Sequence, residues 1–284
     1  IDALHAFELE QGAAAAQRAR AALVAQGGLP DAGNTFAFLL ADGLASQEEA
    51  LVTSIYHALG GIQLCGGSAG DGMRFEQTHL FHGGRFHTDC ALLTLVRSPA
   101  PFRVFKTEHF APSSEQLVVT GADPGRRIVT EINGEPAAVE YARICGVPAD
   151  ALTPMVFATH PVVVTLGGSV FVRSIQKVNP DGSLTFFCAI DEGIVLRVAR
   201  GGDMVANLAD AFAGVVREIG VPDLVLGCDC VLRYLELEQG RLRPAIDALM
   251  TRHNVIGFAT YGEQFNAMHV NQTFTGVAIA ATRG

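Results

Sequence analysis

The sequence has neither a long apolar run nor an excess of basic residues. None of its hydrophobic stretches approaches the roughly 18 consecutive apolar residues that a membrane-spanning helix needs, although 49% of the 284 residues are hydrophobic. Asp and Glu number 29 against 20 Lys and Arg, which gives a net charge of −9 and a pI near 5.4. The short apolar runs predict no membrane segment. Because nucleic-acid phosphates attract a basic surface, the acidic balance predicts no nucleic-acid partner.

Sequence signatures of catalysis and of metal binding are also scarce. The chain contains no His-Glu-x-x-His, no Cys-x-x-Cys, no phosphate-binding loop and no dinucleotide-binding glycine fingerprint. The one close cysteine pair, Cys228 and Cys230, supplies only two of the four ligands that a structural zinc site requires. We therefore predict no catalytic residues, no metal site and no enzymatic activity.

The cysteines and the first residues point to a reducing compartment. Six cysteines are scattered through the chain, most of them inside apolar strands, where a cysteine usually acts as a small buried hydrophobe. Residues 1–20 carry acidic side chains and an alanine run instead of the basic start and apolar core of a secretory signal. Both observations predict a cytoplasmic protein with free thiols.

Hydrophobic periodicity predicts a mixture of helices and strands. Residues 9–26 are rich in alanine and favour a helix, and residues 35–41 form an apolar run typical of a buried strand. Asp203 precedes apolar residues at helical spacing, and residues 239–253 are expected to form another helix. Strands joined by hairpins with only a few crossover helices indicate an α+β fold, with antiparallel or mixed sheets and helices packed on the outer faces.

One order of elements occurs twice. Strand 35–41, a helix, strand 62–65, the glycine turn 66–72 and a hairpin ending at residue 96 form the first copy. The second copy runs through strand 224–228, the helix 239–253, strand 255–258, a turn at residues 261–263 and a hairpin ending at residue 280. The pattern indicates a structural duplication with the two turns at corresponding places.

Polar side chains gather in residues 257–280, more densely than an edge hairpin requires. A hairpin needs polar groups on one face only, so the surplus predicts a lined ligand pocket. Arg173 is expected to form a salt bridge in its sheet; its functional alternative is a clamp for a ligand carboxylate. The backbone amides of the glycine turn 66–72 can hold an anion, although such turns also serve simply to reverse a strand. The predicted ligand-binding residues are Ser68, Asp71, Arg173, Tyr261, Glu263, Gln264 and Asn271.

Three segments carry a resemblance to a known family. YGEQFNAMHVNQT near the C-terminus, LCGGSAGDGMRFEQTHLFHGGRFHTDCALLTL at residues 64–95 and RSIQKVNPDGSLTFFCAIDEG at residues 173–193 resemble FIST domains, which are sensory modules. The resemblance runs from about residue 36 onward and implies a ligand sensor with two packed halves. Residues 1–125 would be the N-terminal half, whose first strand and helix units are expected to be missing, and residues 126–284 the C-terminal half.

FRVFKTEHF and GEQFNAMHVNQTFTG resemble a narrower group, the bacterial haem-binding nitric oxide sensors of this family. The resemblance implies haem as cofactor, and a histidine kinase or a diguanylate cyclase or phosphodiesterase as partner. His109 and His269 are the candidate iron ligands, because an imidazole can ligate haem iron; a hydrogen-bonded structural role is the alternative for each. Two other functions stay open: a sensor of a small polar ligand such as an amino acid, and an interaction scaffold without a small-molecule ligand.

Overall fold

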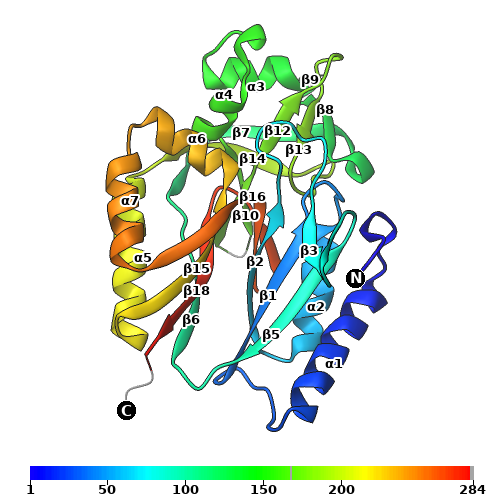
Figure 1. Ribbon diagram of the computed structural model, residues 1–284. Helices are drawn as coiled ribbons and strands as arrows, with labels where there is room; N and C mark the ends of the chain where they lie inside the picture. Colours follow the sequence, from blue (N-terminus) through cyan, green and yellow to red (C-terminus); the bar gives the residue numbers. More distant parts are fainter. Residues whose placement is uncertain (167, 282–284) are drawn as a thin grey trace.

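The computed structural model describes residues 1–166 and 168–281 and confirms the predicted α+β class. Two eight-stranded sheets, called the first and the second sheet below, form the frame, and helices cover their outer faces (Figure 1). In Figure 1 the second sheet lies above the first, whose strands are drawn roughly upright beneath it. The helices are α1 (Leu9–Ala25), α2 (Glu48–Leu59), α3 (Ala137–Cys145), α4 (Pro154–Thr159), α5 (Met204–Ile219), α6 (Val231–Gln239) and α7 (Arg243–Arg252).

The first sheet combines strands from the two ends of the chain. Its order is β5 (Ala91–Arg97), β1 (Thr35–Asp42), β2 (Gln63–Ala69), β16 (Val255–Phe265), β15 (Pro222–Cys230), β18 (Phe274–Ala280) and β6 (Phe102–Lys106), with β17 (Met268–Val270) beside β16. β1 is parallel to β2 and antiparallel to β5, just as β15 is parallel to β16 and antiparallel to β18. The repeated order in the sequence thus corresponds to a repeated strand topology, whose copies join where β2 runs antiparallel to β16.

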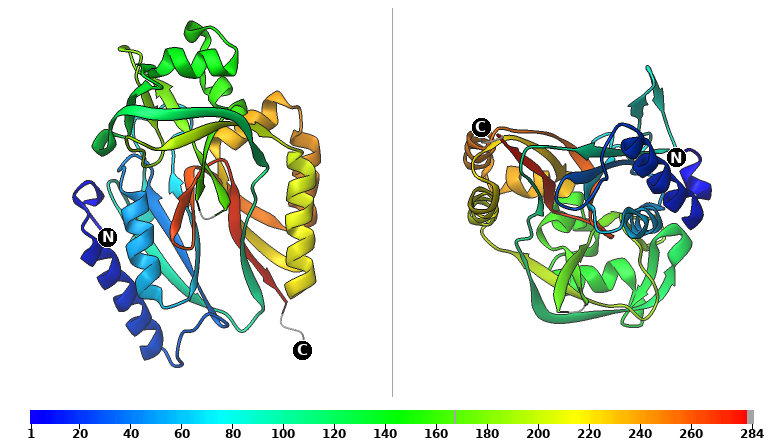
Figure 2. Two further views of the ribbon diagram at one scale, coloured as in Figure 1. Left: turned by 180° about the vertical axis from the view of Figure 1, so that it is seen from behind. Right: turned by 90° about the horizontal axis from the view of Figure 1, so that it is seen from below.

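The first sheet has two groups of helices on it. α1 and α2 form one group, in which α2 buries Leu51 and Ile55 against β1 and β2. α5 and α7 form the other, in which α5 buries Leu208 and Phe212 against β15 and β18. The view from below in Figure 2 shows these groups at opposite ends of the sheet. None of the helices in the described residues is both long enough and apolar enough to cross a bilayer.

The second sheet is built from the middle of the chain. Its order is β11 (Ser169–Arg173), β10 (Val162–Leu166), β14 (Val195–Gly201), β7 (Phe110–Asp123), β8 (Ile128–Ile132), β13 (Leu184–Phe186) and β12 (Ile175–Val178), with β9 (Glu135–Pro136) beside β8. α3 and α4 pack Tyr141 and Phe157 on it. The remaining elements are a small hairpin of β3 (Leu80–His82) and β4 (Arg85–His87), and the short helices η1 (Leu4–Ala6), η2 (Pro124–Arg126) and η3 (Ala149–Ala151).

The chain enters and leaves the second sheet at one place. The backbone N–H of Gly202, after β14, donates to the carbonyl of His109, before β7, at 2.7 Å. Nearby, the side-chain amide of Asn207 donates to the carbonyl of Glu108 at 2.7 Å. The predicted division between residues 125 and 126 falls at η2, which joins the neighbouring strands β7 and β8. That division stays a prediction, since strand pairing alone does not delimit domains.

Buried contacts hold the second sheet against the first. Phe75, Phe187 and Tyr261 form a cluster of three rings with centroids 4.9 to 5.7 Å apart. The side chain of Gln272 donates to the carbonyl of Ala158 in α4 at 2.7 Å. These contacts place the segment between β16 and β18 directly under the second sheet, so the polar side chains of this segment lie at the junction of the two sheets.

Candidate functional site

The predicted polar residues of β16 and of the segment after it lie inside the protein. Tyr261 is 2% exposed, Asn271 is 1% exposed, and Glu263 and Gln264 are fully buried. The pairing of β16 with β2 brings the two predicted glycine turns together, and the Gln264 side-chain amide donates to Ser68 Oγ at 2.8 Å. Residues almost 200 positions apart therefore form one buried polar cluster.

Tyr261 and Asp71 are hydrogen-bonded to each other. The Tyr261 hydroxyl donates to the Asp71 carboxylate and accepts from the Asp71 backbone N–H at 3.1 Å. Asp71 also accepts from the backbone N–H groups of Phe75, Glu76 and Gln77. The Tyr261 hydroxyl and these amides hold the pKa of the Asp71 carboxyl well below its usual range, although partial burial opposes them. Both side chains therefore fix the loop after β2, and their predicted contact with a ligand stays a prediction.

Glu263 has a different environment, because it lies in the interior without a cation beside it. Its carboxyl accepts from Thr260 Oγ1 at 2.5 Å and from Thr273 Oγ1 at 2.6 Å. Burial raises its pKa to about 8, which the hydrogen bonds from the two threonines only partly offset. The carboxyl is therefore mostly protonated at neutral pH, and its hydrogen bonds are used within the protein.

Four buried polar atoms of this region have no hydrogen-bond partner among the described residues. They are Oε1 of Gln264, Oδ1 of Asn271 and both ring nitrogens of His269. A buried donor or acceptor without a partner costs about 1–3 kcal/mol, and such groups are rare unless they meet water or a ligand. Their concentration within eight positions of one segment marks this region as the candidate binding site.

A pocket of about 150 Å³ opens next to His269, between α2, β11 and β17. We call it the ligand pocket. Of the predicted residues, Arg173 and His269 line it; the others do not. A second recess of only about 10 Å³ lies on the other side of Phe171 and includes Asn271. The residues lining the ligand pocket are Glu49, Thr53, Phe171, Arg173, Ala267, Met268 and His269.

The ligand pocket contains both signs of charge. Burial lowers the pKa of His269, so its imidazole is neutral at pH 7. Burial alone would raise the pKa of Glu49, but the Arg127 guanidinium and the backbone N–H of Ala189 lower it overall, and a protonated His269 would lower it further. Arg173 forms no ion pair with a carboxylate in the described part of the chain. An ionised Glu49 and the guanidinium of Arg173 thus line one small cavity.

Glu49 belongs to a buried charge cluster that spans the two sheets. The Arg127 guanidinium, next to β8, donates to Glu48 at 2.8 Å and also to Glu49, and to the carbonyl of Phe187 at 2.6 Å. The backbone N–H of Ala189 donates to Glu49 at 2.6 Å. We call Arg127, Glu48 and Glu49 the Arg127 cluster. The sequence analysis missed all three residues, because the acids look like an ordinary acidic first turn of a helix and nothing near Arg127 in sequence indicates its partners.

His109 has a partner of its own. Its Nε2 lies 2.9 Å from each carboxylate oxygen of Glu236 in α6, and only 2% of its side chain is exposed. The imidazole therefore bonds across the point where the chain passes between the sheets. This arrangement matches the structural role that the sequence analysis left open for His109, and it leaves that nitrogen occupied.

Residues 66–70 match the Gly-x-Ser-x-Gly pattern of a nucleophile elbow, but their structure differs from such an elbow. An elbow is a sharp strand-to-helix turn that exposes the serine. Here Ser68 lies within β2, is fully buried and is bonded to Gln264. No side chain of a histidine is bonded to it, and no cluster of metal-ligating side chains occurs in the described residues.

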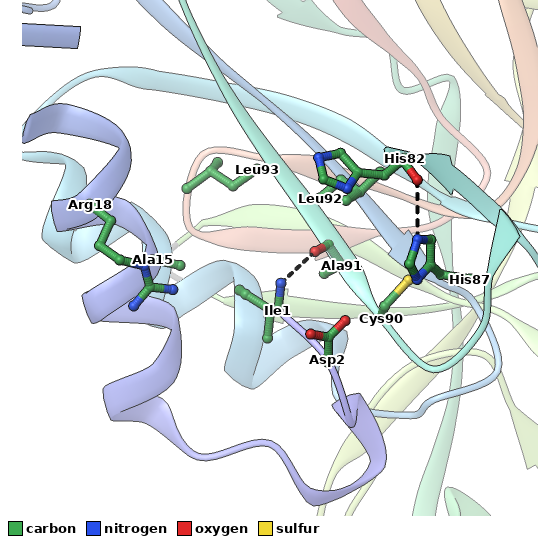
Figure 3. A pocket seen from close by; sticks show the side chains of 10 residues that line it. All are labelled: Ile1, Asp2, Ala15, Arg18, His82, His87, Cys90, Ala91, Leu92 and Leu93. Carbon is green, nitrogen blue, oxygen red and sulfur yellow. Dashed lines mark hydrogen bonds between the residues drawn. The ribbon is translucent and has the colours of Figure 1, made fainter. Parts of the chain in front are cut away.

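A larger recess of about 410 Å³ lies away from these residues, beside α1 (Figure 3). Two of its polar groups are bonded within the lining: the ammonium of Ile1 donates to the Ala91 carbonyl at 2.9 Å, and a ring nitrogen of His87 lies 3.1 Å from the His82 carbonyl. None of the predicted ligand-binding residues lines it. We therefore place the candidate site at the ligand pocket.

Comparison with known families accounts for almost the entire chain. Residues 3–135 match the FIST N domain and residues 137–266 match the FIST C domain. Neither curated proteins nor solved structures gave a match. The two family matches, arranged in this order, agree with the segments singled out in the sequence. The chain thus belongs to the FIST family, whose domains are sensory, ligand-binding parts of signal-transduction proteins.

Proposed function

We propose that this chain senses a small zwitterion, an amino acid or a close analogue, in the ligand pocket. The observation that carries the proposal is that two side chains of opposite charge, Arg173 and Glu49, line the same cavity. A guanidinium binds a carboxylate in two-point geometry, and an ionised carboxylate binds an ammonium group. The neutral imidazole of His269 adds an unpartnered donor and an unpartnered acceptor.

The size of the pocket favours a ligand of few atoms. Pockets for drug-sized molecules usually measure about 300–1,000 Å³, whereas this one measures about 150 Å³. The apolar part of its wall comes from Phe171, Ala267 and Met268. A compact ligand with a short apolar side chain therefore suits it better than a nucleotide or a flat ring system.

The signal would arise from Glu49. This side chain faces the ligand pocket and also bonds to Arg127 and to Ala189 of the second-sheet region. A ligand ammonium that attracts Glu49 changes the contact between α2 and the second sheet. A ligand shifts a conformational equilibrium only if it binds the two states with different affinity, and this shared carboxylate supplies the difference. The partner that reads the change would be a histidine kinase or a cyclic-di-GMP enzyme in the cytoplasm.

Calorimetry tests the proposal. The 284-residue chain is titrated with each of the twenty amino acids in turn, and at least one is expected to bind. Arg173→Met should weaken that binding by at least tenfold, because the ligand carboxylate loses its cation. Lys177→Met is the matched control and should bind like the parent chain, because residue 177 is exposed on β12, which follows β11 in the chain but lies at the other end of the sheet order. The absence of heat with all twenty, or full affinity in Arg173→Met, would refute the proposal.

Haem is the second candidate, because of one observation: both ring nitrogens of His269 are buried without a partner. An imidazole nitrogen is a suitable ligand for haem iron. The cavity of about 150 Å³, however, is smaller than the usual range for drug-sized molecules and is therefore too small for a porphyrin. Haem therefore does not fit the pocket in this geometry unless α2 and β11 separate. Haem binding stays a prediction, and with it the sensing of nitric oxide.

An absorption titration with haemin tests this prediction. If His269 holds the iron, the chain should develop a Soret band with one equivalent of haemin, and His269→Ala should lose or shift it. His109→Ala is the comparison, because His109 is bonded to Glu236 and its removal should leave the band unchanged. A parent chain without a specific band would exclude haem, and an unchanged band in His269→Ala would exclude His269 as the ligand.

A further inference from the structure

The ligand pocket has a charged end. Burial raises the pKa of the Cys188 thiol, and the Arg173 guanidinium lowers it while the Glu49 carboxylate raises it. Both charges therefore lie near the same sulfur, and both groups line the pocket. In the proposed function the carboxylate and the ammonium of the ligand, which are attached to one carbon, bind at this end.

The other end of the pocket is uncharged. Thr53 follows Glu49 by one turn of α2, so the two side chains share a helix face with their Cβ atoms about 5–6 Å apart. The Thr53 hydroxyl donates to the carbonyl of Ala267 at 3.1 Å, which fixes α2 on the turn between β16 and β17. Ala267 and Met268, from this turn and the strand after it, line the pocket. They close it about one helical turn away from the carboxylate.

Phe171 belongs to the uncharged end as well. It precedes Arg173 by two residues on β11, so both side chains lie on one face of the strand, roughly 7 Å apart along it. The ammonium of Lys106 lies 5.5 Å from the centre of the Phe171 ring and 5.8 Å from that of Phe265. Because Phe265 pairs with Met268, the Phe171 ring lies beside the strand pair that closes the pocket.

The Phe171 ring also separates two cavities. It lines the ligand pocket of about 150 Å³ and the recess of about 10 Å³ that includes Asn271. The ring is only half-buried, and it comes from the edge strand of the second sheet. A smaller side chain at this position would join the two cavities and leave Arg173 and Glu49 in place.

We propose that Phe171 limits the length of the ligand side chain, so that the ligand is an amino acid whose apolar side chain has about three carbons or fewer. The inference rests on the proposed function, which assigns the carboxylate and the ammonium of the ligand to the charged end. The ligand side chain extends from there towards Ala267 and Met268 and stops at the Phe171 ring. A longer side chain overpacks this wall, whereas a shorter one leaves part of it without contacts.

A homologous series of ligands tests this role. Glycine, alanine, 2-aminobutyrate, norvaline and norleucine differ by one methylene group at each step. In calorimetry the parent chain should bind each member about fourfold more tightly than the one before, up to norvaline, and norleucine roughly tenfold more weakly than norvaline. Phe171→Ala should bind norleucine more tightly than norvaline, because the joined cavity admits the longer chain. Phe86→Ala, which removes an exposed ring on β4, is the matched control and should behave like the parent.

The ratio of the norleucine affinity to the norvaline affinity is the decisive readout, because a general loss of packing weakens both ligands alike. Phe171→Leu should give a ratio between those of the parent and of Phe171→Ala, and it decides the matter if the alanine variant does not fold. Affinity that rises through norleucine in the parent, or a ratio that neither variant changes, would overturn the inference and leave the proposed function intact. A parent chain that binds none of the five also overturns it; if none of the twenty amino acids binds either, the proposed function fails as well.

Discussion

Replacing Arg127 by alanine is expected to lower the free energy of unfolding by about 3–5 kcal/mol, the usual cost of removing one partner of a buried ion pair. The reason is the surroundings of Glu48. Its side chain is 1% exposed, and Arg127 is the cation that it contacts. Without the guanidinium, the buried Glu48 and the half-buried Glu49 would be two neighbouring carboxylates that have lost their shared cation, and the Phe187 carbonyl would lose a donor. Urea unfolding followed by circular dichroism measures the loss.

Two further variants separate this effect from a general cost of losing an arginine. Arg243→Ala removes the cation of a pair with Glu238 of α6 in which both side chains are exposed, and such pairs contribute only about 0–1 kcal/mol. Arg127→Met combined with Glu48→Gln removes both charges and should recover part of the stability. A loss below about 1 kcal/mol in Arg127→Ala, equal to that of Arg243→Ala, would show that the Arg127 cluster does not hold the sheets together.

Replacing Glu263 by glutamine is expected to stabilise the protein at neutral and alkaline pH but not at pH 4. The pKa of Glu263 is about 8 in the folded protein, compared with 4.5 for an ordinary glutamate. Between these values the unfolded chain releases the proton while the folded chain keeps it, so the stability of the parent chain falls as the pH rises. Below pH 4.5 both states hold the proton, and above pH 8 both have released it.

The size of this effect follows from the shift. Each pKa unit corresponds to about 1.4 kcal/mol, so ionisation of the unfolded chain costs the parent about 3 kcal/mol of stability by pH 7. A glutamine at residue 263 keeps a neutral side chain that can bond to Thr260 and Thr273 and does not titrate. Urea unfolding at pH values from 4 to 9 should therefore show a difference between Glu263→Gln and the parent chain that grows with pH up to pH 8.

An exposed carboxyl provides the comparison for this titration. Glu10→Gln changes an exposed side chain in α1, and its stability should follow the parent chain at every pH. If the Glu263→Gln difference were constant over the range, or decreased with pH, then Glu263 would be ionised in the folded protein. In that case its burial beside two threonines would need a cation that has not been identified.

Local features of the sequence predicted local elements well. The side chain of Asp203 accepts from the Ala206 N–H at 2.9 Å, and Met204, Leu208 and Phe212 are buried as the helical spacing predicts. A helix depends on residues three or four positions apart, which one sequence displays directly. The predicted helix 239–253 was wrong in its first turn, since α6 ends at Gln239 and α7 starts at Arg243. The chain turns at Gly240, and α6 itself was not predicted.

The candidate site could be predicted only in part, because its geometry depends on residues far apart in the chain. The density of polar groups in residues 257–280 predicted a pocket in the segment that carries the unpartnered buried atoms of Gln264, His269 and Asn271. It did not reveal that Asp71, 190 positions away, bonds to Tyr261, or that Glu263 faces two threonines. Arg173 and His269 do line one pocket, but Glu49 completes it from α2. These three residues come together only when the second sheet packs on the first, and no local sequence pattern predicts that packing.

The adjacent entry and exit of the chain at His109 and Gly202 have a mechanical consequence. Two connecting segments that lie side by side restrain the position of the middle segment relative to the first sheet. They restrain its rotation about that point much less. The angle of the middle segment over the first sheet then depends on the contacts between the two sheets, such as those of Arg127 and Gln272. If the proposed ligand changes those contacts by a few kcal/mol, the change would be enough to redistribute the angle of a segment of more than ninety residues.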